Sequence, residues 1–358
     1  MSLSVSISIN RQDACHALVN WWRSMMRDIT VLLKAYQLPL AMVALYLAAA
    51  FSLSLFGLHS PPVRLLFGVA YAFIAIFIMI IPISWFSAGT ALRLANIMLV
   101  VCMMVSIKIA ALGFKANIPL LNPWAWDLDL AAFDRMLHAG MDPWRLLMPP
   151  VGQEITLKIL DMAYSLWFPL LLISWFLVGM VRHHDNLKTQ YVLAFLLAWV
   201  IGGNLLATMF SSVGPVFVGN LHPDAGNYSE LLRRLAHADA LYGLTATELH
   251  SILWRQYEAG MNIFGGISAF PSMHNALAVL MALVAWRIHR LLGIAMTIFA
   301  AMIYIGSILL AWHYAADGMA GIVIALASWH MAGWITRRLD RKPQARRYRA
   351  LLRAVANR

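Results

Sequence analysis

Two histidines and one aspartate have side chains and a spacing suited to nucleophilic chemistry. His274 lies in "FPSMHNA", at the beginning of an apolar run, and His313 precedes Asp317 by four residues in "HYAADGMAG". Residues four apart share one face of a helix, so the Asp317 carboxylate would accept a hydrogen bond from one ring nitrogen of His313. The other ring nitrogen would then be free to attack, and His274 would be placed to protonate a leaving oxygen.

The same residues have two other interpretations. A His-x-x-x-Asp pair on one helix face, together with a second histidine, is also a plausible set of ligands for a metal ion. Alternatively, each side chain serves ordinary packing at the end of a membrane helix, with its polar tip near the interface. The residue types alone therefore leave catalysis, metal binding and a structural role open.

The composition indicates what surrounds these residues. Of 358 residues, 61% are hydrophobic and only 12% are charged, which is far from the usual soluble range. About eight apolar stretches are long enough, or nearly so, to cross a hydrocarbon core of roughly 30 Å. They lie near 36–58, 64–86, 93–113, 158–181, 191–212, 271–288, 291–312 and 315–336. Because backbone polar groups must be satisfied inside lipid, we predict an all-α integral membrane protein with about eight transmembrane helices.

The distribution of positive charge predicts the orientation of these helices. The net charge is +11, and basic residues are concentrated in the N-terminal arm and in 182–188, 287–290 and 337–353. With eight crossings these regions all lie on one side, which the positive-inside rule assigns to the cytoplasm. We therefore expect a membrane protein with both termini cytoplasmic. The basic tail is expected to contact anionic lipids, not nucleic acid.

The chain divides into four regions. These are a cytoplasmic or interfacial amphipathic arm (1–34), N-terminal transmembrane helices (35–113), a membrane domain (114–336) and a basic tail (337–358). Two long segments of the membrane domain, 114–157 and 213–270, fall on the periplasmic side. Their apolar spacing predicts short interfacial helices over 127–137, 229–243 and 245–260. Structureless segments of this length are uncommon, so we expect both segments to cover a functional site.

The three ionisable residues meet at this periplasmic face. His274 lies in the first turn of the sixth span, for which we predict Pro271 at the first helical position. His313 ends the seventh span and Asp317 begins the eighth. Ionisable groups at membrane depth are costly and tend to mark functional sites. The free N–H groups of the sixth helix, with the Ser272 hydroxyl, would be able to hold an anion such as a phosphoryl group.

These motifs resemble those of the type-2 phosphatidic acid phosphatase superfamily. "FPSMHNA" and "HYAADGMAG" are similar to its second and third signatures, and "WDLDLAAFDRMLHAG", "AYSLWF" and "FSSVGPVF" look like the branch containing inositol phosphorylceramide synthases. The likeness covers about residues 120–325. It implies a six-helix membrane core in which His313 forms a phosphohistidine, Asp317 orients it and His274 is the general acid. It implies no metal and no other cofactor.

The sequence departs from the family where the phosphatases carry cations. The phosphatase type has a Lys and an Arg before a Pro in its first signature, and an Arg six residues before the nucleophile. Here Gly214 precedes Pro215, and Ser307 stands six residues before His313. A phosphodiester carries one charge and needs fewer cations than a phosphomonoester, so the departure favours a phospholipid donor. The substrate contacts that we expect instead are Gly214, Ser272, Arg135, Arg145 and Arg255.

The leading hypothesis is a membrane-embedded lipid phosphotransferase that moves a phosphoryl or phospho-head group from a phospholipid, such as phosphatidylinositol, to a lipid or alcohol acceptor. A lipid or polyprenyl phosphate phosphatase would use the same residues with water as acceptor. The alternative outside the enzymes is a membrane transporter. A transporter would be expected to have charged residues or broken helices near the membrane midplane. Here the polar residues within spans, Lys108, Asp161 and Asn204, occur singly in different spans. Membrane lipids are the expected partners, and the sequence predicts no oligomeric state.

Overall fold

The computed structural model describes residues 11–61, 88–181, 185–222, 228–260, 266–341 and 350–351. Every element assigned within these ranges is helical, which confirms the all-α class. Six helices there are long and apolar enough to cross a membrane, and Met273–Ile288 is a shorter apolar helix. These seven coincide with seven of the eight expected spans. The remaining one, near 64–86, lies outside the described residues.

The apolar helices form one bundle. They are α2 (Gln37–Ser52), α4 (Ala88–Lys115), α8 (Gln153–Met180), α9 (Asp185–Ala198), α14 (Met273–Ile288), α15 (Arg290–Leu309) and α16 (Ala315–Asp340). Helix α9 continues through a π-helical segment, η2 (Trp199–Leu206), and a last turn, α10 (Ala207–Met209). Helix α14 packs on α15 and α16, while α4 packs on α2, α8, α9 and η2. A buried cluster of apolar side chains joins these helices, so α4 is part of the same core as the helices that carry the histidines.

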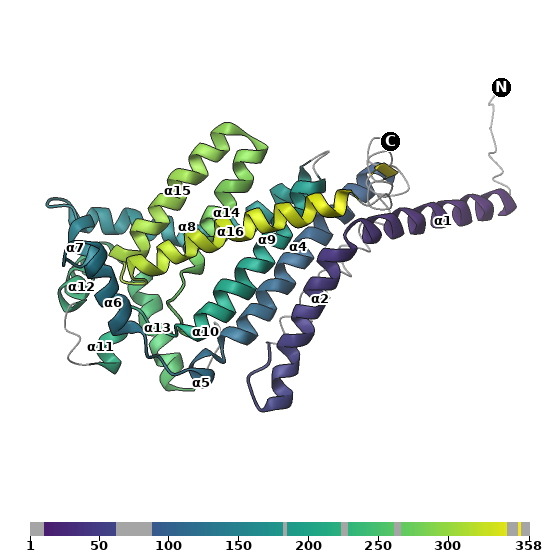
Figure 1. Ribbon diagram of the computed structural model, residues 1–358. Helices are drawn as coiled ribbons and strands as arrows, with labels where there is room; N and C mark the ends of the chain where they lie inside the picture. Colours follow the sequence, from purple (N-terminus) through teal and green to yellow (C-terminus); the bar gives the residue numbers. More distant parts are fainter. Residues whose placement is uncertain are drawn as a thin grey trace, which may run out of the picture.

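Shorter helices gather at one end of this bundle (Figure 1). They are α5 (Ile118–Leu121), α6 (Asp127–Leu137), α7 (Pro143–Leu147), α11 (Val218–Leu221), α12 (Ser229–Tyr242) and α13 (Thr245–Glu258). The short helices predicted over 127–137, 229–243 and 245–260 are therefore present, and the bounds of 127–137 agree; their position at the membrane interface stays a prediction. Helix α6 starts with Asp127 and Asp129, which suit the positive end of the helix dipole. It ends before Gly140, whose φ of +85° lets its N–H bond to the Arg135 carbonyl.

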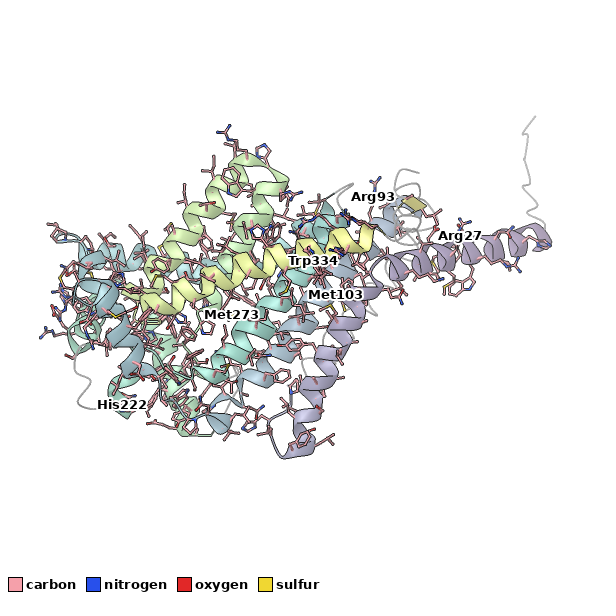
Figure 2. All side chains as sticks on the ribbon, in the orientation of Figure 1. Arg27, Arg93, Met103, His222, Met273 and Trp334 are labelled. Atoms are coloured by element: carbon pink, nitrogen blue, oxygen red, sulfur yellow. The ribbon has the colours of Figure 1, made fainter. Side chains whose placement is uncertain are left out.

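The opposite end of the molecule carries helix α1 (Arg11–Ala35) and the C-terminal end of α16 (Figure 1). Arg27 of α1 and Arg93 of α4 lie toward this end, whereas His222 lies at the end with the short helices (Figure 2). Trp22 and Met26 of α1 are exposed, as suits a helix that rests on a membrane surface. The arrangement therefore separates the basic end of the bundle from the end that the short helices cover.

Candidate active site

His313 and Asp317 lie where the chain turns from α15 into α16. Ala311 has a φ of +60°, a left-handed conformation that is costly for alanine and reverses the chain just before the histidine. Nδ1 of His313 is 3.3 Å from Oδ2 of Asp317, and the same oxygen accepts the N–H of Tyr314 at 3.0 Å. The predicted contact between histidine and carboxylate is thus confirmed. A carboxylate bound to both ring and backbone holds the imidazole in one orientation.

The surroundings of His313 determine its protonation. His313 is 6% exposed and Asp317 is completely buried. Burial lowers the pKa of the His313 imidazole to about 3, and the positive charge of Lys115 acts in the same direction. The ring is therefore neutral at physiological pH, which is the form that has a free electron pair for attack.

His274 approaches His313 from the first turn of α14. The two imidazole centroids are 6.1 Å apart. The rings of Tyr164 and Trp167 on α8 lie 4.9 and 4.4 Å from the His274 ring, and Trp167 Nε1 donates to the His274 carbonyl at 3.0 Å. Elements far apart in the sequence therefore bring two imidazoles and one carboxylate together, against an aromatic wall. This arrangement would bring one phosphoryl group within reach of a nucleophile and an acid.

The family of the chain follows from comparison with known proteins. A family model of the PAP2 superfamily matches residues 128–331, which is more than half of the 358 residues. The chain belongs to the PAP2 superfamily. The matched stretch contains His274, His313 and Asp317, and membership of a superfamily of membrane phosphatases and phosphotransferases agrees with the apolar helices. The chain gives no match with curated proteins or with solved structures.

The beginning of α14 differs from the prediction. Pro271 was expected at the first helical position, but the helix begins at Met273 and Ser272 is its N-cap. Ser272 Oγ accepts the backbone N–H of Asn275 at 3.4 Å and its side-chain amide at 3.0 Å. Serine is a far better N-cap than phenylalanine, which explains the shift of the boundary. The buried Ser272 oxygen therefore caps the helix as an acceptor, and donation of its O–H to an anion stays a prediction.

Two aspartates of α6 hold the backbone around the site, and the sequence analysis missed both. Asp134 accepts the N–H groups of Ala315 and Ala316, the first two residues of α16, at 2.7 and 2.8 Å. Asp127 accepts the N–H of Gly214 at 2.8 Å and the Tyr314 hydroxyl at 3.1 Å. The two aspartates are seven residues apart and share one helix face. In the sequence, two aspartates seven residues apart on the buried face of an amphipathic helix were the signal that could have identified them.

Replacing Asp134 by asparagine is expected to lower turnover by roughly 10- to 100-fold and stability by about 1–3 kcal/mol. The reason is that asparagine offers one acceptor oxygen to two buried N–H groups, and these groups belong to the turn that carries His313 and Asp317. Turnover and thermal unfolding in detergent would be measured together. Glu248→Gln is the matched control, because Glu248 is an exposed carboxylate of the covering helix α13 and does not line the cavity. Equal effects of the two variants would contradict this role of Asp134.

The positions where PAP2 phosphatases carry arginine are closed to a cation here. Gly214 has a φ of +85°, and a Cβ atom at this position would lie 2.7 Å from the carbonyl oxygen of Trp312. Ser307 is completely buried. Its hydroxyl accepts the Asn275 amide at 3.1 Å, and its carbonyl accepts the N–H of His313 at 2.9 Å. Gly214 thus serves close backbone packing, and neither position has room for an arginine side chain.

The arginines expected as replacements lie on the covering helices. Arg145 is 2.6 Å from Glu230, and Arg135 is 3.3 Å from Asp142. Arg255 is exposed on α13. These ion pairs place the positive charges of Arg145 and Arg135 beside carboxylates. Two of the three expected cations are therefore already neutralised by acidic side chains.

Helix α13 lies over the candidate site. Its His250 ring is 4.1 Å from the ring of Trp312, the residue before His313, and burial lowers the pKa of His250 to about 3. Asp161 of α8 accepts the N–H groups of Thr245 and Ala246 at 3.0 and 2.9 Å. Asp161 therefore fixes the start of the covering helix, a role that its isolated position in the sequence did not suggest.

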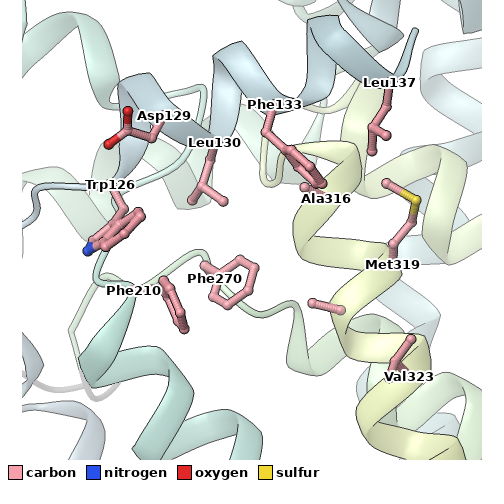
Figure 3. Close-up of a pocket in the computed structure, with 11 residues that line it drawn as sticks. Trp126, Asp129, Leu130, Phe133, Leu137, Phe210, Phe270, Ala316, Met319 and Val323 are labelled. Carbon is pink, nitrogen blue, oxygen red and sulfur yellow. The ribbon is translucent and has the colours of Figure 1, made fainter.

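An apolar cavity of about 610 Å³ lies between α6 and α16, beside the turn that carries His313 (Figure 3). Its described lining residues are Trp126, Asp129, Leu130, Phe133, Leu137, Phe210, Phe270, Ala316, Met319, Ala320 and Val323. Ala316 is adjacent to Asp317 in the chain. A cavity of this size and character suits the apolar part of a small amphiphile.

Proposed function

We propose that this protein is a lipid phosphotransferase that works through a phosphohistidine. The observation that carries the proposal is a buried, neutral His313, held by Asp317 at 3.3 Å and facing His274 with 6.1 Å between the ring centroids. His313 attacks the phosphorus of a donor lipid, the bond from phosphorus to the leaving oxygen breaks, and His274 gives that oxygen a proton. In the second half, the acceptor hydroxyl attacks the phosphohistidine, His274 takes its proton, and His313 is released.

The donor in this proposal is a phosphodiester lipid. Gly214 and Ser307 stand where the phosphatases of the family carry cations, and neither position has room for an arginine side chain. Fewer cations support a substrate with one negative charge, because stabilising a doubly charged phosphomonoester takes more of them. Phosphatidylinositol is the first donor to test, since the motifs resemble the branch with inositol phosphorylceramide synthases. The leaving group would then be a diacylglycerol, and the covalent intermediate would carry inositol phosphate on His313.

The acceptor in this proposal is an alcohol that enters from the membrane. His313 is 6% exposed and lies beneath α13, which limits access of water to the phosphohistidine. The apolar cavity beside Ala316 would hold the chain of a lipid acceptor. We also propose that the site faces the periplasm of a bacterial inner membrane. The covering helices lie opposite α1 (Figure 1), which supports that orientation.

The purified protein, reconstituted in vesicles with phosphatidylinositol labelled in its head group, would test this function. Addition of a lipid alcohol, either ceramide or diacylglycerol, is expected to give a labelled lipid product. The activity is expected to persist in a metal chelator, because the mechanism uses only side chains. Label released only as water-soluble phosphate or inositol phosphate would contradict transfer and favour the phosphatase. Loss of activity in chelator would contradict the metal-free mechanism.

A further inference from the structure

Two lysines of α4 lie within a helix that is long and apolar enough to span a membrane. Lys108 and Lys115 are seven residues apart, two helical turns or about 10 Å along the axis, so they share one face. Within the described part of the chain, the ion pairs involve other basic residues. A charged group at membrane depth is costly and is retained where it serves a function. Among the described residues, neither ammonium group forms an ion pair with a carboxylate.

Helix α4 packs on η2, and η2 in turn contacts the start of α14. Lys108 Nζ lies 4.1 Å from the ring centroid of Trp199, in the π-helical segment η2. Gly202 of the same segment packs on Met273, since a Cβ at Gly202 would be 3.2 Å from the Met273 sulfur. Met273 is the residue before His274. Helix α4, η2 and the start of α14 thus meet at one place, and π-helical segments are frequent at functional sites.

Electrostatics agrees with this geometry. The positive charge of Lys115 acts on the His313 ring. The contacts from Lys108 to Trp199 and from Gly202 to Met273 lead to the residue before His274. Both lysine residues are partly buried. They lie on a helix that packs on η2 and precedes the matched family region 128–331.

We infer that Lys108 and Lys115 form the anion site that holds the phosphoryl group of the substrate, in place of the cations that the family carries elsewhere. This inference rests on the proposed function for the identity of the substrate. At the family positions, Gly214 and Ser307 supply no charge, so the charge must come from another element. The phosphatases of the family carry one lysine and two arginines, whereas this site would have two lysines. The smaller positive charge suits a phosphodiester, which has a single negative charge. The site also gives the N-terminal spans a role that the motifs alone did not suggest.

Binding of tungstate, an inert oxyanion, would test the site without turnover. Tungstate affinity would be measured by calorimetry in the His313→Ala protein, in which covalent chemistry is removed. Adding Lys108→Met or Lys115→Met is expected to weaken binding by about tenfold each, since each removes one charge at low dielectric. The double variant is expected to show no binding, and Lys115→Arg is expected to retain most of it. Unchanged affinity in the double variant would overturn the inference.

Stability separates a ligand-binding role from a structural one. Methionine keeps the apolar stem of lysine and removes an uncompensated charge, so both variants are expected to unfold at the same or a higher temperature. A lower unfolding temperature would instead assign the lysines to folding and would overturn the inference. Arg290→Gln is the matched control, because Arg290 is exposed at the start of α15. Its tungstate affinity and stability are expected to match those of the parent.

The same variants in a wild-type His313 background distinguish failure of this inference from failure of the proposed function. If the protein is a transferase and the lysines bind phosphate, lipid product falls at least tenfold in each variant, mainly through KM. If lipid transfer is intact in both variants, the anion site is wrong and the proposed function stands. If the unmodified protein transfers no label while the lysine variants lose tungstate binding, the anion site stands and the proposed function is wrong.

Discussion

Replacing His313 by alanine is expected to abolish turnover, with a fall of at least about 10³-fold, because loss of a nucleophile removes the covalent route. The structure supports this role through burial, the neutral ring and the contact with Asp317 at 3.3 Å. The acid-labile phosphoenzyme that the unmodified protein forms with a labelled phospholipid is expected to disappear as well. Both losses follow from one missing ring nitrogen.

The measurement is rapid acid quenching of labelled protein, followed by phosphoenzyme counting and a turnover assay. His330→Ala is the matched control, because His330 is an exposed histidine of α16. It is expected to keep full activity and a full phosphoenzyme signal. Full turnover in His313→Ala, or a phosphoenzyme that survives in it, would contradict the assignment of the nucleophile.

Replacing Asp317 by asparagine is expected to lower kcat by about 10²- to 10⁴-fold with little change in KM, as when other oriented histidines lose their carboxylate. In the folded protein, Oδ2 of Asp317 binds both Nδ1 of His313 and the N–H of Tyr314. An asparagine can place its amide oxygen at this position and keep both contacts, but it carries no negative charge. The positive charge that the ring gains when His313 attacks would then lose its stabilising carboxylate, while the contacts to substrate remain.

Steady-state kinetics with the phospholipid donor, together with the unfolding temperature, would check this expectation. A structural role alone would lower stability and leave the kcat of the folded fraction unchanged. Asp317→Glu, which keeps the charge, is expected to recover part of the activity. Equal kcat in Asp317→Asn and the unmodified protein would show that the carboxylate does not orient the nucleophile.

Local pattern in the sequence was enough to identify the helices and the three central residues. Apolar runs predict spans because lipid requires every backbone group to be bonded within its own segment. The four-residue spacing of His313 and Asp317 predicted their contact, although His313 precedes Tyr314, the N-cap of α16, and is not itself helical. The same reasoning predicted α6 with its observed bounds, Asp127–Leu137. Each of these inferences depends on residues that are close in the chain.

The contacts between distant segments were decided only by the tertiary structure. Asp134 caps α16, Asp161 caps α13, and Lys108 lies on Trp199 of η2. In the sequence these residues look like isolated charges, because nothing in their spacing states which helix end or which ring they will face. The start of α14 differed from the prediction for a local reason, because Ser272 caps the helix through Asn275, three residues on. The contact between Asn275 and Ser307, by contrast, forms only in the packed bundle.

The sequence by itself therefore determined a helical membrane protein with a His-x-x-x-Asp pair and a second histidine at one face. Periodicity and hydropathy are properties of a single segment, and they persist whatever the segment packs against. Only the tertiary structure brought the two imidazoles to 6.1 Å, closed the arginine position at Gly214 and placed α4 beside the site. Those features depend on which helices share the core, and packing of many side chains at once decides that choice.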